Sequence, residues 1–542
     1  MGQRPRGREG LPRISIPNLK LAPGTDEAAL RALAARALKI PAGDITAMRI
    51  RKKSLDARKK DDIRYVYTVG VTVRGDEQRL VRRCRGAALV QDRPYPIPHI
   101  APPETRPVIV GFGPAGMFAA LLLARAGANP IVLERGPDAG TRSAQIAAFR
   151  AGGAFDPECN VQFGEGGAGT FSDGKLNTGT HDARIGFVLA EFAAHGAPEH
   201  ITYDAKPHIG TDVLVEVVQS LRREVIARGG EVRFGHRMTG LTVEGGRITA
   251  LTVHGPDGDY TLPARQVILA IGHSARDTFE ILHAQGVPME PKPFSMGVRI
   301  EHRQSDINAA QYGAAAERLP AADYSLSCHL PDGSSAYTFC MCPGGEVFAA
   351  ASETGGVCTN GMSSSRRDGQ NANAAVLVTL HPEDFPDKST LGGMYWQRSI
   401  EQRAYACGGG NYHAPAQRAG DFLAGRASTA PGRVQPTYRP GVTWCDLHDV
   451  LPQRITATLA QALPVFGRKL RGFDDPDAVL TAPETRSSSP VRIVRGPDRC
   501  STGVQGLYPC GEGAGYAGGI TSAAVDGLRC AECVLTALQN EA

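Results

Sequence analysis

The chain has 542 residues, 42% of them hydrophobic, with 60 Lys and Arg against 55 Asp and Glu. This length leaves room for two or three domains with a large hydrophobic core. No stretch approaches the roughly 18 uninterrupted apolar residues of a transmembrane helix, and residues 1–24 lack the apolar core of a secretory signal. We therefore expect a cytoplasmic protein without a membrane span.

Residues 1–100 differ from the rest of the chain in charge, with 22 Lys and Arg against 10 Asp and Glu. The other 442 residues have the opposite balance, 38 against 45. Hydrophobic patterns in this module predict strands over 14–21, 65–73 and 80–89 and a helix over 28–38. The module is therefore predicted to be a small α+β domain, with a ferredoxin-like arrangement as one candidate.

A basic run from Arg49 to Lys60 is the main feature of this module. We interpret it as a solvated or domain-docking face, with an anionic substrate as an alternative partner. Nucleic acid binding is not expected, because aromatic residues are not interleaved with the charges and no known module is recognisable. A Pro-rich stretch over 93–103 then predicts a linker into the next domain.

A strand, a glycine-rich turn and a helix follow the linker. The apolar run 108–110 leads into a G-x-G-x-x-G motif, and the small apolar residues 117–128 predict a tightly packed helix. A second strand over 131–133 ends at Glu134, about 20 residues after the first glycine, where an acidic side chain can bind an adenosine ribose. The helix N-terminus offers N–H groups to phosphates. The predicted dinucleotide-binding residues here are Gly111, Gly113, Pro114, Ala115, Gly116, Glu134 and Arg135.

A second glycine-rich loop runs from Gly164 to Gly169 and is followed by polar residues up to Lys175. Backbone without side chains can lie against a flat cofactor ring, although an ordinary tight loop has the same composition. The polar side chains could bind the ribityl chain or the edge of such a ring. The predicted contacts are Gly166, Gly167, Ala168, Gly169, Thr170, Ser172, Asp173 and Lys175.

A helix over 212–228 and a β-meander over 232–269 are predicted next. The last strand, 265–272, would end beside the adenine of a bound nucleotide. Three side chains near these elements could donate a proton or hold an anion: His208, His273 and Arg276. A purely structural role is the alternative for each of them.

The region over 276–480 is predicted to be an inserted α+β substrate domain. Cys340 and Cys342 belong to a strand-like segment, 337–342, and side chains two apart on a strand share a face. Both thiols could therefore line one pocket wall, in a redox role or in simple packing. The twelve cysteines show no iron–sulfur or zinc spacing, so no metal is expected. Three arginines of this region are candidate carboxylate binders: Arg299, Arg366 and Arg367.

The C-terminal segment decides which dinucleotide is expected. Residues 506–515 predict a strand ending in a glycine-rich turn, and a helix follows from Gly518 to about Gln539. This pattern resembles the second signature of FAD-binding proteins of the glutathione-reductase type, in which an acidic residue holds the ribityl–phosphate region. Glu512 stands here for the more usual Asp, and FAD is preferred to NAD. The predicted contacts are Gly272, Gly511, Glu512, Gly518, Gly519, Ile520 and Thr521.

The fold class that these elements predict is α/β. A Rossmann-like FAD-binding domain of the glutathione-reductase type would consist of residues 104–275 and 481–542. The inserted domain would interrupt it at 276–480, and the N-terminal module, 1–100, would precede it. Beside a flavin, Lys175 would favour the reduced anion, with a structural ion pair as the alternative.

Five longer segments together resemble the bacterial family of uncharacterised FAD-dependent dehydrogenases: residues 162–176, 206–212, 272–279, 338–345 and 359–363. That family shares the basic N-terminal module, so the likeness covers nearly the whole chain. The resemblance implies FAD and redox chemistry, and it implies no particular substrate.

These observations predict an FAD-dependent oxidoreductase that transfers hydride through flavin N5 to or from a small organic substrate. Its catalytic candidates are His273, Lys175, Cys342 and Cys340. Because no second glycine-rich β–α–β unit is present, NAD(P)H is expected at most as a transient electron donor or acceptor. The alternatives are a single-domain flavin monooxygenase, a reductase of C=C bonds, or a flavin-binding structural or sensory protein. The direction of electron flow and the oligomeric state are left open.

Overall fold

The computed structural model describes residues 13–91 and 94–541. The chain forms two compact units, of which the smaller comprises Met1–Pro96, Pro198–Pro207 and Gln311–Pro320. The larger unit comprises Ile97–Ala197, His208–Ala310 and Ala321–Ala542. The smaller unit therefore includes two segments from far along the chain.

The smaller unit contains a four-stranded antiparallel sheet and two α-helices. Its elements are β1 (Ile14–Leu21), α1 (Ala29–Leu38), the 3-10 helix η1 (Ala42–Asp44), β2 (Ile45–Asp56), β3 (Arg64–Val73), α2 (Glu77–Arg83) and β4 (Ala88–Leu89). The β–α–β–β–α–β sequence with the sheet order β2-β3-β1-β4 is that of a ferredoxin-like arrangement. In its core, Leu30, Ala34 and Leu38 of α1 pack with Val69 and Val71 of β3.

The strand predicted over 80–89 is replaced at its start by the end of helix α2, and a turn follows. α2 begins after Asp76, whose carboxylate caps the helix by accepting a hydrogen bond from a backbone N–H of the first turn at 3.1 Å. Leu80 and Cys84, four residues apart, both face the core. The prediction was wrong because it missed this cap and the helical spacing. Only Ala88–Leu89 pairs as a strand, with β1.

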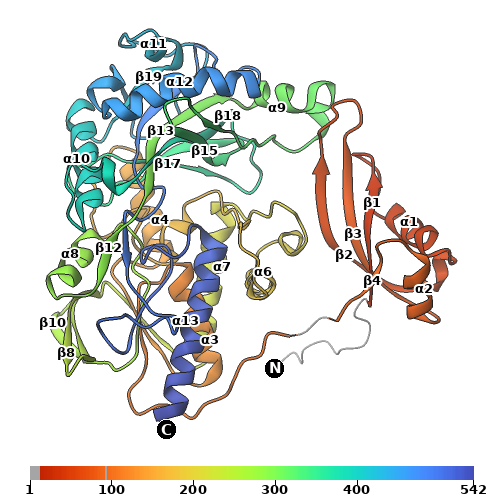
Figure 1. Ribbon diagram of the computed structural model, residues 1–542, viewed down its shortest axis with the longest axis horizontal. Helices are drawn as coiled ribbons and strands as arrows, with labels where there is room; N and C mark the ends of the chain where they lie inside the picture. The colour runs from red at the N-terminus through yellow and green to blue at the C-terminus, as the bar shows by residue number, and fades with distance from the viewer. Residues whose placement is uncertain (1–12, 92–93, 542) are drawn as a thin grey trace. The chain divides into compact units, whose positions relative to one another are not determined.

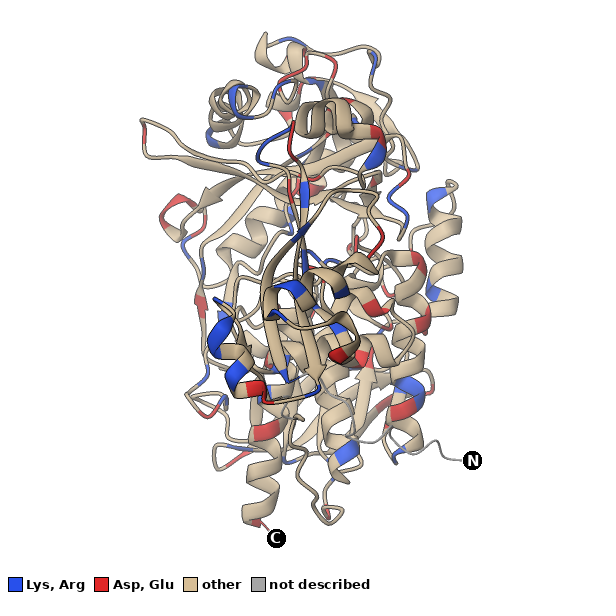
Figure 2. Cartoon of the chain, turned by 90° about the vertical axis from the view of Figure 1, so that its right-hand side faces the viewer, with Lys and Arg blue, Asp and Glu red and all other residues tan. Residues whose placement is uncertain are grey.

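The basic run of the smaller unit lies on β2 and in the turn after it. Figure 2 marks the Lys and Arg residues of the chain. Lys53 forms an ion pair with Glu27 at 2.9 Å and lies 5.1 Å from the centre of the Tyr65 ring. Arg58 likewise pairs with Asp56 at 2.6 Å. Part of the run is therefore neutralised within the unit, and its role as a docking face stays a prediction.

A five-stranded parallel sheet lies in the larger unit. Its order is β23-β11-β5-β6-β7, with the strands Leu507–Pro509, Val267–Leu269, Val108–Val110, Ile131–Glu134 and Glu231–Phe234. From the central β5 the chain proceeds to one side for β6 and β7 and to the other side for β11 and β23. In open parallel sheets, ligands bind beyond the carboxyl ends of the strands at such a reversal.

Helices cover one face of this sheet and a meander covers the other. α3 (Pro114–Ala126) packs on β5, β6 and β11, and α13 (Ile520–Glu541) runs beside α3 (Figure 1). The meander consists of β8 (Arg237–Glu244), β9 (Arg247–Gly255) and β10 (Gly258–Pro263). Its apolar residues share one hydrophobic core with the parallel strands. The meander is shorter than predicted, because the two ends of the range 232–269 belong to β7 and β11.

A seven-stranded mixed sheet forms the centre of the region that follows. Its order is β14-β15-β18-β13-β21-β19-β20, with the strands Ser327–His329, Ser335–Cys342, Asn371–Leu380, Phe294–Arg303, Val479–Glu484, Ala414–Arg418 and Val442–Trp444. β13 and β18 pair along ten residues and are almost wholly buried. α12 (Gln453–Lys469) packs against β18, β13, β14 and β15.

Two small sheets and several helices complete the larger unit. The small sheets are β12 (Met289–Pro291) with β22 (Val491–Ile493), and β16 (Gly345–Ala349) with β17 (Thr359–Ser363). The other α-helices are α4 (Ala139–Arg150), α5 (Gly167–Thr170), α6 (Arg184–Ala194), α7 (Thr211–Ala227), α8 (Arg276–Ala284), α9 (Gln304–Tyr312), α10 (Gly392–Cys407) and α11 (Ala419–Leu423). Within the described residues, none of the helices has the length and apolarity needed to span a membrane.

Candidate functional site

The turn between β5 and α3 requires glycine at two positions. Gly111 has a positive φ of 96°, and a Cβ on Gly116 would lie 1.9 Å from the Gly111 carbonyl oxygen. Gly113 has an extended backbone and precedes Pro114, the first residue of α3, and no side chain caps this helix. The N–H groups of the first turn of α3 therefore suit an anionic ligand.

Glu134 connects three loops at the carboxyl edge of the parallel sheet. Its buried carboxylate accepts hydrogen bonds from the N–H groups of Phe112 (2.8 Å), Gly136 (3.0 Å) and Gly164 (2.9 Å). An ionised carboxylate accepts about four hydrogen bonds, which leaves capacity for one more donor such as a ribose hydroxyl. The ribose contact stays a prediction, and the structure adds a role in holding the loops together.

Arg135 forms ion pairs within the protein. Its guanidinium lies 2.7 Å from Glu158 and 2.8 Å from Asp277 of α8. The guanidinium also lies 4.1 Å from the centre of the Phe163 ring. These contacts explain the position of Arg135 without the predicted cofactor contact.

The second glycine-rich loop packs directly on the first. The N–H of Gly166 donates to the Phe112 carbonyl at 2.9 Å, and a Cβ on Gly167 would lie 3.0 Å from the Cα of Gly113. Arg142 of α4 fixes this loop, and sequence reasoning missed it. The fully buried guanidinium donates to four backbone carbonyls, those of Asn160, Val161, Glu165 and Gly167, at 2.6–2.8 Å. A lone arginine in an amphipathic helix gives no sequence signal for such a role.

The hydroxyl groups that follow this loop bond to its own backbone. Thr170 donates to the Glu165 carbonyl at 3.2 Å, and Ser172 donates to the Gly169 carbonyl at 2.7 Å. Thr170 is buried, whereas Ala168 and Gly169 are partly exposed. The loop therefore presents mainly backbone, and its predicted cofactor contacts stay predictions.

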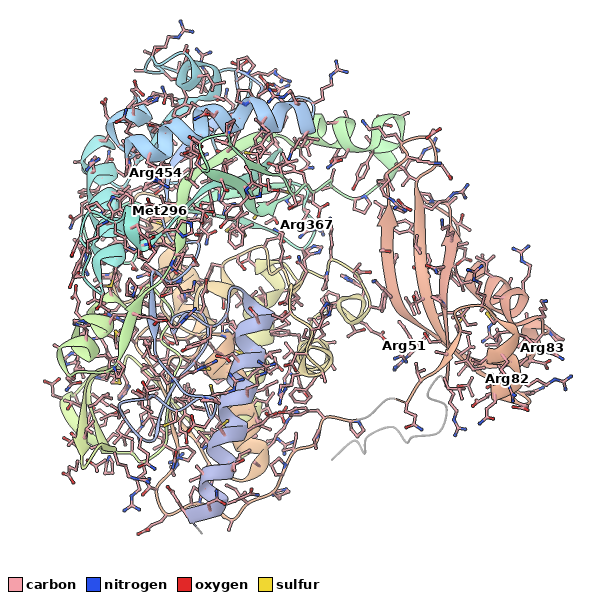
Figure 3. The ribbon with its side chains drawn as sticks, viewed as in Figure 1. Arg51, Arg82, Arg83, Met296, Arg367 and Arg454 are labelled. Atoms are coloured by element: carbon pink, nitrogen blue, oxygen red, sulfur yellow. The ribbon has the colours of Figure 1, made fainter. Side chains whose placement is uncertain are left out.

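Asp173 and Lys175 belong to a buried ion-pair cluster. The carboxylate of Asp173 lies 3.2 Å from the Nζ of Lys175 and accepts hydrogen bonds from Ser363 and Arg367. Arg367, labelled in Figure 3, comes from the loop after β17. Burial alone would raise the pKa of Asp173, but the Lys175 and Arg367 charges outweigh it and hold that pKa below its usual value. The ion pair named as an alternative for Lys175 is thus present.

Lys175 also reaches the two cysteines of β15. Its Nζ donates to the Met341 carbonyl and lies 3.9 Å from the Sγ of Cys342. Cys342 is fully buried and Cys340 is partly exposed. The predicted regular strand is interrupted here by a bulge, because the register to β18 shifts between Phe339 and Cys342. The Sγ of Cys342 nevertheless donates to the Cys340 carbonyl at 3.2 Å, so the two residues are in contact.

His273 and Glu512 meet where the turns after β11 and β23 come together. The Nδ1 of His273 lies 3.7 Å from the carboxylate of Glu512, and the buried Nε2 has no hydrogen-bond partner among the described residues. Burial and the charges of Arg486 and Arg276 lower the pKa of His273 to about 3. Burial raises the pKa of Glu512 to about 7. The imidazole is therefore neutral near pH 7, and its role as a proton donor or anion clamp stays a prediction.

Two of the predicted anion binders are occupied by buried carboxylates. Arg276 donates to both oxygens of Glu401 at 2.8 and 2.9 Å. Arg299 donates to both oxygens of Glu484 at 2.9 Å. Because these pairs are bidentate and buried, both arginines act in the framework of the fold. The Nε2 of His208 lies 3.2 Å from the Ser365 carbonyl oxygen. The side chain of Arg366 is exposed to solvent. The proposed roles of both residues stay predictions.

The start of α13 completes the site. Gly511 has a φ of 77°, and its N–H donates to Asp526 of α13 at 2.8 Å. The hydroxyl of Thr521 donates to the Leu176 carbonyl at 2.7 Å. A Cβ on Gly169 would lie 3.2 Å from the side chain of Ile520. α13 therefore begins beside the second glycine-rich loop.

The glycines around these turns leave a cradle of bare backbone. A Cβ added to Gly272, Gly518 or Gly519 would meet no atom within 4 Å. A Cβ on Gly113 would meet only the Cα of Gly167, at 3.8 Å. Uncapped N–H groups, open backbone and the carboxylates of Glu134 and Glu512 fit an extended dinucleotide such as FAD.

Residues 293–487 match a family described as "FAD-dependent protein, C-terminal domain-like", and residues 13–72 match a domain of unknown function, DUF8436. An uncharacterized protein from Clostridium beijerinckii is 44% identical over 535 residues, which cover 96% of this chain and 98% of that protein. The chain belongs to the same family as this Clostridium protein. Its matched C-terminal domain coincides with the region of the seven-stranded sheet.

Two further proteins are more distantly similar to the chain. The probable fumarate reductase Ifc3 from Shewanella frigidimarina is 26% identical over 193 residues, 32% of this chain and 33% of that protein. A geranylgeranyl bacteriochlorophyll reductase-like structure from Thermoplasma acidophilum has 11% sequence identity and a TM-score of 0.36. The matched region covers 80% of this chain and 79% of the Thermoplasma chain. This score is below the level at which two chains share a fold.

Proposed function

We propose that this family member binds FAD at the carboxyl edge of its parallel sheet and transfers hydride through flavin N5 to or from a small organic substrate. The observation that carries the proposal is the convergence of three segments: the first turn of α3, the end of β6 and the beginning of α13. The proposal includes a glutathione-reductase-type FAD domain made of 104–275 and 481–542, with 276–480 as the inserted substrate domain.

Each segment has a distinct role in this proposal. The N–H groups after Gly113 hold the pyrophosphate, and Glu134 accepts from the adenosine ribose. Glu512 would hold the ribityl–phosphate region, and the positive end of α13 would stabilise negative charge on the pyrimidine part of the ring. FAD, when bound, supplies two-electron redox chemistry, and the protein supplies orientation and electrostatics.

The contacts of the four catalytic candidates fall into two groups. The Nδ1 of His273 lies 3.7 Å from the carboxylate of Glu512. The Nζ of Lys175 lies 3.9 Å from the Sγ of Cys342, which donates to the Cys340 carbonyl. The neutral His273 can donate or accept one hydrogen bond to a substrate, and Lys175 provides positive charge.

The test begins with the purified full-length chain. We expect bound FAD with a flavin absorbance spectrum, and bleaching of this spectrum on anaerobic mixing with a suitable electron donor. NADH and NADPH are the first donors to try, because they distinguish a nicotinamide partner from an organic substrate alone. Flavin that stays oxidised with every donor, including dithionite, would argue for a structural role of FAD.

The Gly113→Val variant tests the proposed pyrophosphate-binding site. The backbone of Gly113 is extended and its Cβ position is free of close contacts, so the protein should fold. The valine side chain would lie where the pyrophosphate is proposed to lie, and the purified variant should be colourless. Gly43→Val is the control, since Gly43 lies in the smaller unit and its Cβ would also meet no atom within 4 Å. A fully flavinylated Gly113→Val protein would disprove the assigned site.

A further inference from the structure

Cys340 and Cys342 are two of the catalytic candidates, but the proposed hydride transfer assigns no step to their thiols. Cys340 has a positive φ of 42° within the bulge of β15. The Sγ of Cys342 donates to the carbonyl oxygen of Cys340 at 3.2 Å. Residues two apart have Cα atoms at most about 7 Å apart, near the upper end of the range for disulfides.

The two thiols differ in access to solvent. Cys340 is partly exposed, while Cys342 has no exposed surface. Thiol–disulfide exchange needs an accessible thiolate that attacks and a second thiol close enough to attack the mixed disulfide that results. The bulge places a partly exposed cysteine residue next to a buried one.

Charged groups from several elements face this pair. The positive groups are Lys175, with its Nζ 3.9 Å from the Sγ of Cys342, and Arg299, which donates to the Cys340 carbonyl at 2.8 Å. The negative groups are Asp173, Glu484 and Glu512. Asp173 is paired with Lys175 and Arg367, and Glu484 is paired with Arg299. Tyr324 also faces the pair, and it is neutral because burial raises its pKa.

This environment favours a thiolate at Cys340. The nearby Cys342 thiol and the charges of Lys175 and Arg299 hold the pKa of Cys340 well below its usual value, against the effect of burial. The nearby Cys340 thiol and burial raise the pKa of Cys342. A partly exposed cysteine with a lowered pKa near a lysine is the setting in which thiols react as nucleophiles.

We propose that Cys340 and Cys342 are a redox-active dithiol that reduces disulfides, with Cys340 as the attacking group. In the first step the Cys340 sulfur bonds to one sulfur of the substrate disulfide, and the other sulfur leaves as a thiolate. In the second step the Cys342 sulfur attacks Cys340, loses its proton to the released thiolate, and expels the remaining thiolate. The protein pair loses two electrons, which the substrate disulfide gains as it becomes two thiols. These steps do not involve FAD, so the inference goes beyond the proposed function.

The chain contains its own comparison pair. The Sγ atoms of Cys510 and Cys530 and a carboxylate oxygen of Asp526 lie within 4.8 Å of one another, and both cysteines are fully buried. Their nearest carboxylate is Asp526, and burial raises the pKa of Cys510 well above its usual value. We therefore expect this pair to stay reduced under conditions that oxidise Cys340 and Cys342.

The first experiment treats the purified full-length protein with oxidised glutathione and maps each cysteine by mass spectrometry of peptides. The wild-type protein should form the Cys340–Cys342 disulfide without retained glutathione, while Cys510 and Cys530 stay reduced. Cys342→Ser should retain glutathione on Cys340, because the resolving thiol is missing. Cys340→Ser should retain none at Cys342. A wild-type protein that keeps both thiols, or modifies both pairs equally, would overturn the proposal.

The second experiment needs no buried cysteine to be replaced. The rate of iodoacetamide alkylation near neutral pH should be at least about tenfold higher at Cys340 than at Cys510, in proportion to its thiolate fraction. Lys175→Met should slow alkylation at Cys340 by about tenfold, and Lys175→Arg should restore most of it. Equal rates at Cys340 and Cys510, or no effect of Lys175→Met, would contradict the proposed thiolate. The FAD content of each variant shows whether the cofactor site is affected separately.

Discussion

A Cβ on Gly527 of α13 would lie 2.0 Å from the carbonyl oxygen of Ala115 in the first turn of α3. The two helices therefore approach closely where α3 begins. Asp526, the neighbour of Gly527, accepts a hydrogen bond from the N–H of Gly511 at 2.8 Å. One part of α13 thus positions both the proposed pyrophosphate-binding turn and the turn that carries Glu512.

The Gly527→Ala variant tests this close contact. Alanine is favoured over glycine in a helix by about 1 kcal/mol, but overpacking costs about 1–3 kcal/mol. Because the clash is with backbone, we expect a net loss of stability, together with a lower FAD content. Thermal unfolding and flavin absorbance measure the two effects. Gly186→Ala in α6, where a Cβ meets no atom within 4 Å, should be neutral or slightly stabilising, and an identical result for both variants would refute the argument.

Glu134→Gln tests the carboxylate that joins three loops. A glutamine has one acceptor oxygen and an NH₂ group that cannot accept, so at least one of the three buried N–H donors loses its partner. We expect a loss of about 1–3 kcal/mol in stability and weaker FAD binding, measured by urea unfolding and by flavin titration. Glu158→Gln removes a half-exposed partner of Arg135 and should cost about 1 kcal/mol or less. Unchanged stability and affinity in Glu134→Gln would show that the loops are held in another way.

Arg299→Met distinguishes a structural arginine from a substrate-binding one. Arg299 and Glu484 are both buried, and removal of one partner leaves an uncompensated charge that costs about 3–5 kcal/mol. The double variant Arg299→Met/Glu484→Gln should recover much of this loss, as measured by urea unfolding. A single variant with wild-type stability and a raised KM would instead support the original interpretation of Arg299 as a carboxylate binder.

The β5–α3–β6 unit could be predicted closely because its glycines are required by contacts between residues that are near in the sequence. Predicted and observed boundaries of these elements differ by a few residues at most. The tight turn and the close helix–strand contact both join residues that lie within about 20 positions of each other in the sequence, so the local pattern indicates them. The inclusion of residues 198–207 in the smaller unit could not be predicted. It depends on two long-range hydrogen bonds, from the N–H of Lys53 to the Tyr203 carbonyl and from the N–H of Ala205 to the Lys53 carbonyl, both at 2.8 Å.

The chemistry of individual side chains was harder to predict than their positions. His273 follows β11 as expected, yet its charge state depends on burial and on Arg486, which is more than 200 residues away in the sequence. The proximity of Cys340 and Cys342 was expected from a regular strand. In the structure a bulge in β15 brings the two residues together. The extra residue of a bulge could not be predicted from the local sequence pattern.

The raised pKa of Glu512 predicts a pH-dependent stability in the flavin-free protein. Burial raises this pKa from 4.5 to about 7, so the protonated carboxyl is favoured in the folded state. Below pH 4.5 both states are protonated and the burial costs nothing, and the cost develops as the pH rises from 4.5 to about 7. Glu512→Gln should therefore gain stability over the wild type across this window, with a constant difference above it. Urea unfolding of both proteins at several pH values measures the difference, and the exposed Glu216→Gln should show no such trend. Parallel curves for Glu512→Gln and the wild type would mean that water or a nearby cation already compensates the carboxylate.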